Sequence, residues 1–147
     1  MNFVLVYFSR RGNTRQVAKA IAQELGINPI DVNAIDVNAE SPNVADADML
    51  VIGSGTYGGK PGKEMVNFLK NLSFVTGKKA ACFATCATSA KRTLKTMQET
   101  LTKKGYTVVD NFSCFGQYGT ILAASRIGHP TAKELNQARE WARKLKT

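Results

Sequence analysis

Apolar residues along this chain follow two spacings, one typical of buried strands and the other of helices with one apolar face. Nearly continuous apolar runs at 3–8, 49–53 and 79–84 predict buried strands. A further strand is predicted at 106–115. The run at 30–37 is interrupted by polar residues, so we expect it at an edge of the sheet.

Helical spacing appears between and after these runs. Apolar positions three and four residues apart predict helices that contain residues 17–25, 65–72, 94–101 and 135–145. Gly26 is a typical C-terminal stop for the first helix, and Thr131 with Glu134 forms a capping box at the start of the last. Alternating strands and helices predict an α/β fold, a parallel sheet wound on both faces, in a single domain of residues 1–147.

Composition narrows the class of protein. Apolar residues make up 44% and charged residues 21%, as in ordinary globular domains. No apolar run approaches the roughly 20 residues of a membrane span, and the first residues do not resemble a signal peptide. We therefore expect a cytoplasmic protein without a membrane span. Cys82, Cys86 and Cys114 are expected to be buried thiols, and a single histidine, His129, leaves no zinc-ligand spacing.

Small and hydroxyl-bearing residues gather after three of the predicted strands, at 9–14, 54–59 and 85–89. The carboxyl ends of parallel strands meet at one edge, where open α/β sheets bind ligands. The first of these loops joins a buried strand to a helix N-terminus, which is a favourable phosphate site. Neither G-x-x-x-x-G-K-[ST] nor G-x-G-x-x-G is present, and a single histidine makes a Ser-His-Asp or Cys-His catalytic arrangement not credible. The sequence therefore predicts a phosphorylated ligand at this edge.

Two motifs resemble those of the flavodoxin family. The run Ser9-Arg10-Arg11-Gly12-Asn13-Thr14 is similar to the flavodoxin phosphate loop, usually T/S-x-T/S-G-N-T. The run Thr56-Tyr57-Gly58-Gly59, with the strand before it, is similar to the second flavin loop. The strand spacing also matches, and no long insertion interrupts the last strand, as in short-chain flavodoxins. The resemblance implies a flavodoxin-like sheet of order 2-1-3-4-5 and FMN as the cofactor.

The resemblance also implies how each loop contacts FMN. The phosphate would be wrapped by backbone N–H groups and hydroxyls of Ser9, Arg10, Arg11, Gly12, Asn13 and Thr14, with a further hydroxyl from Ser54. The ring would lie along Thr56, Tyr57, Gly58 and Gly59. Tyr57 would stack on one face, and Gly58 is the glycine whose peptide would flip when the flavin is reduced. The ring would also be bordered by backbone groups of Thr85, Cys86, Ala87, Thr88 and Ser89.

The chain departs from the family in two respects. Many flavodoxins place a second aromatic after the fourth strand, but residues 85–90 contain none. Either the second flavin face is open, or it is covered from elsewhere, for instance by Tyr118. Typical flavodoxins are also acidic around the flavin, whereas this chain has a formal charge of +9. Much of that charge lies in the three loops and the helical turns that follow them, at Arg10, Arg11, Arg15, Lys60, Lys63, Lys91, Arg92 and Lys95, with Glu64 as the acidic exception.

Together these features predict an FMN-binding electron carrier without catalytic residues of its own, which exchanges electrons with redox proteins. Its partner is expected to present an acidic docking face, as a ferredoxin or a reductase would. The basic charge comes with no nucleic-acid-binding signature, so no nucleic acid is expected. The alternatives are an NAD(P)H-dependent flavin or quinone reductase, another small FMN oxidoreductase, or a flavin-free binding module on the same fold.

Overall fold

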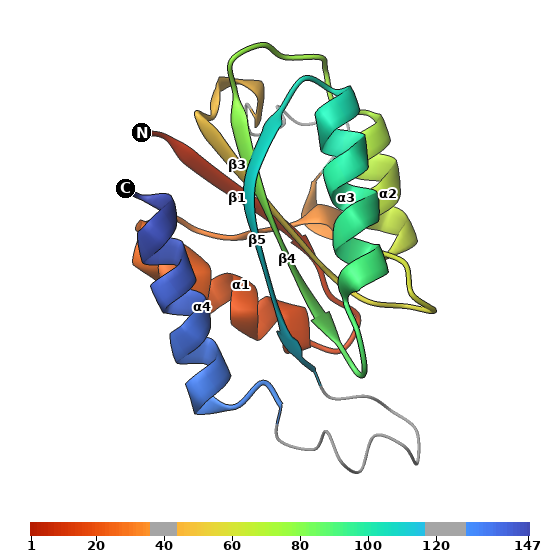
Figure 1. Ribbon diagram of the computed structural model, residues 1–147, viewed down its shortest axis with the longest axis vertical. Helices are drawn as coiled ribbons and strands as arrows, with labels where there is room; N and C mark the ends of the chain where they lie inside the picture. Colours follow the sequence, from red (N-terminus) through yellow and green to blue (C-terminus); the bar gives the residue numbers. More distant parts are fainter. Residues whose placement is uncertain (36–43, 117–128) are drawn as a thin grey trace.

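The computed structural model describes residues 1–35, 44–116 and 129–147 of the chain (Figure 1). A five-stranded sheet has the order β2-β1-β3-β4-β5, and every neighbouring pair is parallel. This confirms the predicted α/β class and strand order. The strands are β1 (Phe3–Phe8), β2 (Ile30–Asp31), β3 (Met49–Gly55), β4 (Lys79–Cys86) and β5 (Thr107–Phe115). The helices are α1 (Asn13–Leu25), α2 (Lys63–Lys70), α3 (Lys91–Lys103) and α4 (Ala132–Leu145), with short 3-10 turns η1 (Val32–Ala34) and η2 (Val44–Asp46).

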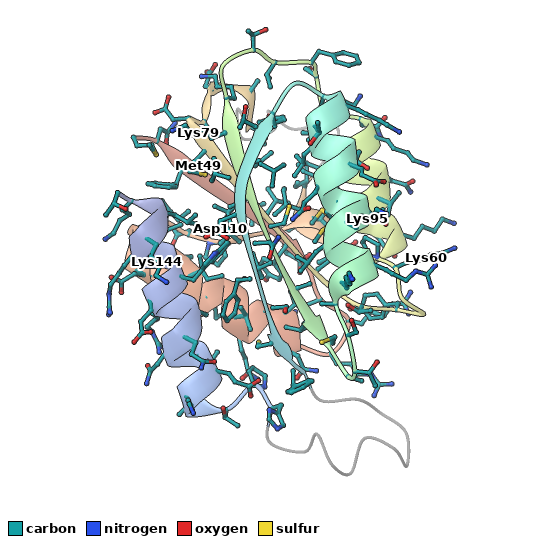
Figure 2. All side chains as sticks on the ribbon, viewed as in Figure 1. Met49, Lys60, Lys79, Lys95, Asp110 and Lys144 are labelled. Atoms are coloured by element: carbon teal, nitrogen blue, oxygen red, sulfur yellow. The ribbon has the colours of Figure 1, made fainter. Side chains whose placement is uncertain are left out.

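Helices cover both faces of the sheet, α1 and α4 on one and α2 and α3 on the other (Figure 1). Alternate residues of each central strand face opposite sides. Leu5 and Val51 pack toward α1 and α4, whereas Val6 and Ile52 pack toward α2 and α3. Side chains fill the space between the sheet and both helix layers (Figure 2). Because both faces are buried, the central strands appear in the sequence as continuous apolar runs.

The second strand is shorter than predicted. The expected strand at 30–37 is wrong in its extent, because β2 contains only Ile30 and Asp31 and is followed by η1. The Asp31 carboxylate accepts a hydrogen bond of 2.9 Å from the Asn33 N–H, which turns the backbone out of the strand. Residues 36 and 37 lie outside the described residues.

The other elements follow the prediction, with shifted ends. β3 continues to Gly55 and β4 to Cys86, each two residues beyond the predicted end. α1 ends before Gly26, which has a left-handed φ of 72°. All three cysteines are buried free thiols, as predicted, and burial raises the pKa of Cys82 and Cys114 to about 12. Within the described residues, no helix is long and apolar enough to cross a membrane.

The predicted capping box also joins the last strand to the last helix. One carboxylate oxygen of Glu134 accepts hydrogen bonds from the N–H and hydroxyl of Thr131, at 2.9 and 3.1 Å, and contacts Nδ1 of His129. The other oxygen accepts the Phe115 N–H at 3.0 Å. Burial opposes the charged form, but these hydrogen bonds outweigh it and lower the pKa of Glu134. The ionised carboxylate therefore fixes the end of β5 against the start of α4.

We expect Glu134→Gln to reduce the free energy of unfolding at pH 7 by about 1–2 kcal/mol, because an amide nitrogen then faces backbone donors. The folded-state pKa lies below the ordinary value of 4.5, so the stabilisation is present above that pH and is lost as the pH falls through the folded pKa. Urea unfolding of both proteins at neutral and acidic pH measures whether their free energies of unfolding converge as the pH falls. Glu140→Gln on the exposed side of α4 is the control. A loss of stability in Glu134→Gln that is the same at neutral and acidic pH would contradict the role of the ionised carboxylate.

Candidate functional site

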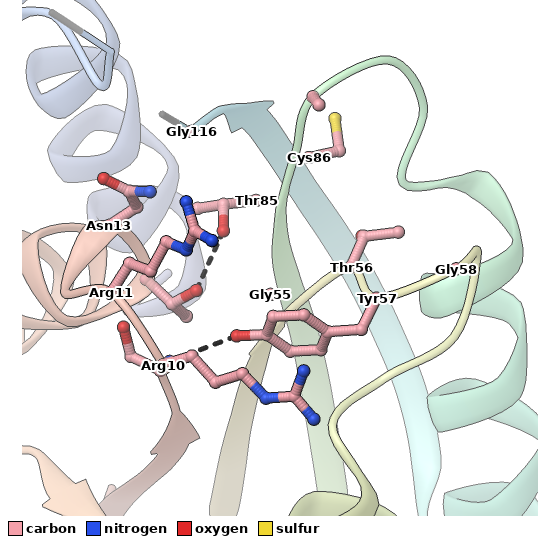
Figure 3. Close-up of a pocket in the computed structure, with 13 residues that line it drawn as sticks. Arg10, Arg11, Asn13, Gly55, Thr56, Tyr57, Gly58, Thr85, Cys86 and Gly116 are labelled. Atoms are coloured by element: carbon pink, nitrogen blue, oxygen red, sulfur yellow. Dashed lines mark hydrogen bonds between the residues drawn. The ribbon is translucent and has the colours of Figure 1, made fainter. Parts of the chain in front are cut away.

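The loops after β1, β3 and β4 enclose a pocket of about 300 Å³ at the carboxyl edge of the sheet (Figure 3). This volume lies at the lower end of the range for small-molecule sites, about 300–1,000 Å³. Arg10 and Arg11 are its charged lining residues. The complete lining is Ser9, Arg10, Arg11, Asn13, Thr14, Gly55, Thr56, Tyr57, Gly58, Thr85, Cys86, Ala87 and Gly116.

One end of the pocket is the N-terminus of α1. Gly12 occupies the N-cap with φ 92°, and no side chain caps the helix. The Gly12 N–H donates a 2.9 Å hydrogen bond to the Ser9 hydroxyl, which shapes the turn. The first N–H groups of a helix have no partner within the helix, and its dipole adds positive potential there. Together with Arg11, this end of the pocket is suited to an anion.

The first and third loops are held together beneath the pocket. The buried hydroxyls of Thr14 and Thr85 share a hydrogen bond of 2.8 Å (Figure 3). The Gly116 N–H donates to the carbonyl of Cys86 at 2.9 Å. A Cβ at Gly116 would approach the Asn13 Cβ to 3.2 Å, so a larger residue would narrow the pocket. These contacts make the wall opposite Tyr57 a fixed surface.

Tyr57 forms the other wall, and its phenol lies across Gly55 (Figure 3). Its hydroxyl accepts a 3.1 Å hydrogen bond from the Arg10 N–H, and the Arg10 guanidinium lies 4.4 Å from the ring centroid. The edge-to-face contact with Phe8 has a centroid distance of 5.8 Å. Burial raises the pKa of Tyr57, although the Arg10 N–H opposes the rise. The phenol is therefore neutral at physiological pH.

A tight turn holds Tyr57 in place. The N–H of Tyr57 donates to the Lys60 carbonyl at 2.8 Å, and the Lys60 N–H donates back at 3.2 Å. Gly58 and Gly59 between them have φ of 60° and 79°, which favour glycine. The peptide flip expected at Gly58 stays a prediction.

Some of the predicted site residues do not line the pocket. Gly12 shapes the turn beneath it, and Gly59 faces Arg92 on its outer side. Ser54 is fully buried within β3. Its hydroxyl donates to the Gly55 carbonyl at 2.8 Å and accepts the Gly62 N–H at 3.0 Å, so its hydrogen bonds stay within the protein.

Thr88 and Ser89 lie beyond the pocket, in an adjoining hollow between α3 and β5. The Ser89 hydroxyl accepts the Lys91 N–H near the start of α3. Tyr118, named as a possible cover for the second flavin face, lies outside the described residues. Sequence reasoning missed Gly55 and Gly116 as lining residues. The signal for both was available, since each is a glycine at the end of a strand on this edge.

Thr56 provides a test of whether the pocket suits a ligand. Thr56 lines the pocket, and its hydroxyl oxygen is buried without a hydrogen-bond partner among the described residues. A buried hydroxyl without a partner is costly, and a polar ligand would satisfy it. The pocket thus combines an anion site, an aromatic wall and a hydroxyl in need of a partner. These features fit a phosphorylated aromatic molecule.

The fold and the pocket define an α/β protein with a candidate ligand pocket at the carboxyl edge of a doubly wound sheet. The family model for the flavodoxin domain matches residues 4–125, and the chain belongs to this family. Membership implies a flavin cofactor. An uncharacterized protein of Methanocaldococcus jannaschii is 29% identical over 99% of this chain and 98% of its own length.

Solved structures share the fold at lower identity. A flavodoxin from the domain Archaea is 20% identical, with a TM-score of 0.66 and full coverage of both chains. The Streptococcus pneumoniae flavodoxin is 17% identical, with a TM-score of 0.73 over 98% of this chain and 97% of its own. The rubredoxin oxygen:oxidoreductase of Desulfovibrio gigas is 18% identical, with a TM-score of 0.76 over 96% of this chain but 34% of its own.

The contact between Tyr57 and Gly55 gives a test of the aromatic wall. A Cβ at residue 55 would lie 2.5 Å from the Tyr57 hydroxyl oxygen, so Gly55→Ala should displace the phenol toward solvent. We expect the raised pKa of Tyr57 to fall toward its ordinary value in this variant, because burial causes the rise. Spectrophotometric titration of tyrosinate measures it, with Tyr57→Phe in both backgrounds to isolate this residue. An unchanged Tyr57 titration in Gly55→Ala would rule out the contact.

Proposed function

We propose that this protein binds FMN in the pocket between Arg10 and Thr85 and carries electrons between redox proteins. The observation that carries the proposal is the pairing of an uncapped helix N-terminus with an aromatic wall in one pocket. A phosphate suits the first, and a flat ring suits the second. Bound FMN would supply reversible electron transfer, and the protein would supply binding, orientation and charge.

The residues take distinct roles in this proposal. The phosphate is held by backbone N–H groups at the start of α1 and by the loop of residues 9–14. Thr56, Tyr57 and Gly58 contact the ring on one side, and residues 85–87 border it on the other. Gly12 and Ser54 shape the loops without lining the pocket. Gly59, Thr88 and Ser89 do not line the pocket and are not assigned a contact with FMN.

The surface around the pocket supports a protein partner of opposite charge. Arg10, Arg11, Lys60 and Arg92 are exposed near the pocket mouth or on the loops beside it. Charged surfaces of opposite sign steer diffusional encounter and raise association rates, an effect that salt weakens. We infer that the redox partner presents an acidic docking face. A ferredoxin-like protein or a reductase has the chemistry required.

One observation favours a second candidate, an NAD(P)H-dependent flavin or quinone reductase. The loop after β4 offers no aromatic side chain, and Cys86 lines both the pocket and the adjoining hollow of about 610 Å³. Lys91 and Lys95 line that hollow. A substrate with an anionic group would thus have access to the ring from this side. The two candidates differ in whether a nicotinamide reduces the flavin directly.

The phosphate site is tested by comparing FMN with riboflavin, which lacks the phosphate. Because charge-assisted hydrogen bonds contribute about 1.5–3 kcal/mol each, we expect FMN to bind about 100-fold more tightly. Quenching of flavin fluorescence measures both dissociation constants. Equal affinities would remove the phosphate site from the proposal.

Gly12→Ala sharpens this test, because alanine at φ 92° is strained and should distort the turn. We expect the variant to weaken FMN binding by about tenfold and to leave riboflavin binding nearly unchanged. Gly26→Ala is the matched control, since Gly26 also has a positive φ with open space around its Cβ position but lies at the far end of α1. Equal losses in both variants would indicate a general effect on stability.

Reduction by NADPH separates the two candidate functions. A carrier exchanges electrons at the exposed flavin edge and does not need a nicotinamide stacked on the ring. We therefore expect the absorbance of the FMN-loaded protein to stay unchanged after mixing with NADPH, while dithionite reduces it fully. Rapid bleaching by NADPH in stopped flow would establish the reductase instead.

A further inference from the structure

A second hollow, separate from the pocket, lies between α2 and α3 and begins at Tyr57. Its volume is about 590 Å³. We call it the basic groove and define it by Lys60, Lys63, Lys70 and Arg92, all exposed. Among the residues that the structure describes, no aspartate or glutamate lines it. The groove is therefore a strip of positive charge on the α2–α3 face of the sheet.

The cations of the basic groove are arranged along two walls. Lys63 and Lys70 are seven residues apart on α2, so they project from the same side of the helix about 10 Å apart. Arg92 lies opposite, in the first turn of α3. It is held near the turn at Gly59, where a Cβ would lie 3.1 Å from its Nη1. Lys60 closes the end next to Tyr57.

The four cations lack counter-charges in the described part of the chain. None of them lies within ion-pairing distance of a described carboxylate, whereas Lys95 pairs with Glu99 and Arg143 with Glu24. The neighbouring acid, Glu64, follows Lys63 on α2 but does not line the groove. Like charges this close repel one another, and an anionic ligand would relieve the repulsion.

Position links the basic groove to the cofactor pocket. Arg10 and Tyr57 line both cavities. A ligand bound along the groove would therefore lie beside the ring wall of the flavin site. The open form of the groove and its exposed lysines suit a protein segment, since small molecules are usually held in clefts that bury most of their surface.

We propose that the basic groove binds an acidic segment of the redox partner, a stretch of several aspartate or glutamate residues. The carboxylates pair with Lys60, Lys63, Lys70 and Arg92, and the body of the partner then rests over Tyr57. The identity of the partner as a redox protein depends on the function proposed above. The preference of the groove for an acidic segment does not.

The test uses a fluorescein-labelled peptide of eight glutamates and measures binding by fluorescence anisotropy at low salt, without added flavin. Lys63→Glu, Lys70→Glu and Arg92→Glu each reverse one charge of the groove. Lys144→Glu on exposed α4 changes the net charge equally but lies on the other side of the sheet from Lys60 (Figure 2). We expect each groove variant to raise the dissociation constant about fivefold and Lys144→Glu to raise it less than about twofold.

Amide chemical shifts locate the peptide independently of affinity. The proposal requires that the largest changes fall on α2, α3 and the turn at Gly58. Equal loss of affinity in Lys144→Glu, or shifts centred on α1 and α4, would overturn it, because binding would then reflect net charge. Displacement of the peptide by NADPH or pyrophosphate at concentrations below the peptide's own dissociation constant would also overturn the proposal, because the groove would then prefer a small phosphorylated ligand.

The outcome is separable from that of the FMN experiments. Peptide binding in the groove by a protein that rejects FMN would defeat the electron-carrier proposal and leave the groove assignment intact. If the protein binds FMN but the peptide shows no preference for the groove, the electron-carrier proposal stands and the groove assignment fails.

Discussion

The parallel register of β1, β3 and β4 is the constraint on which the site depends. Phe8 pairs with Ser54, and Gly55 pairs with Thr85, so the three strands end at nearly the same level. The loops that follow them must therefore begin side by side. The hydrogen bond between Thr14 and Thr85 closes this arrangement across 71 residues of sequence. Packing on both sheet faces opposes a change of register, because a slip of one residue would exchange the side chains that contact the two helix layers.

The same burial explains why most of the fold was predictable. Strands covered on both faces must be apolar throughout, and helices on the sheet must carry an apolar stripe. β2 lies at the edge and has no such requirement. There the Asn33 N–H donates a local hydrogen bond to the Asp31 carboxylate, which outweighs strand propensity, and the predicted strand at 30–37 was wrong in extent.

Most of the predicted site residues that do not line the pocket follow from the underestimated length of β3 and β4. Ser54 was expected in a loop, but it lies inside β3, where its hydroxyl is occupied by Gly55 and Gly62. β4 continues to Cys86, so the end of the strand itself lines the pocket. Thr88 lies beyond it, in the hollow between α3 and β5. Gly55 and Gly116 carry no functional group, so their position at strand ends on this edge was the available signal that they line the pocket.

Arg10 and Tyr57 line both the pocket proposed for the cofactor and the basic groove. A displacement of either side chain by a ligand in one cavity would change the lining of the other. Thermodynamic linkage then requires a symmetry: the factor by which a bound partner changes the affinity for the cofactor equals the factor by which the cofactor changes the affinity for the partner. A carrier built this way would distinguish its loaded from its empty form at the docking surface itself.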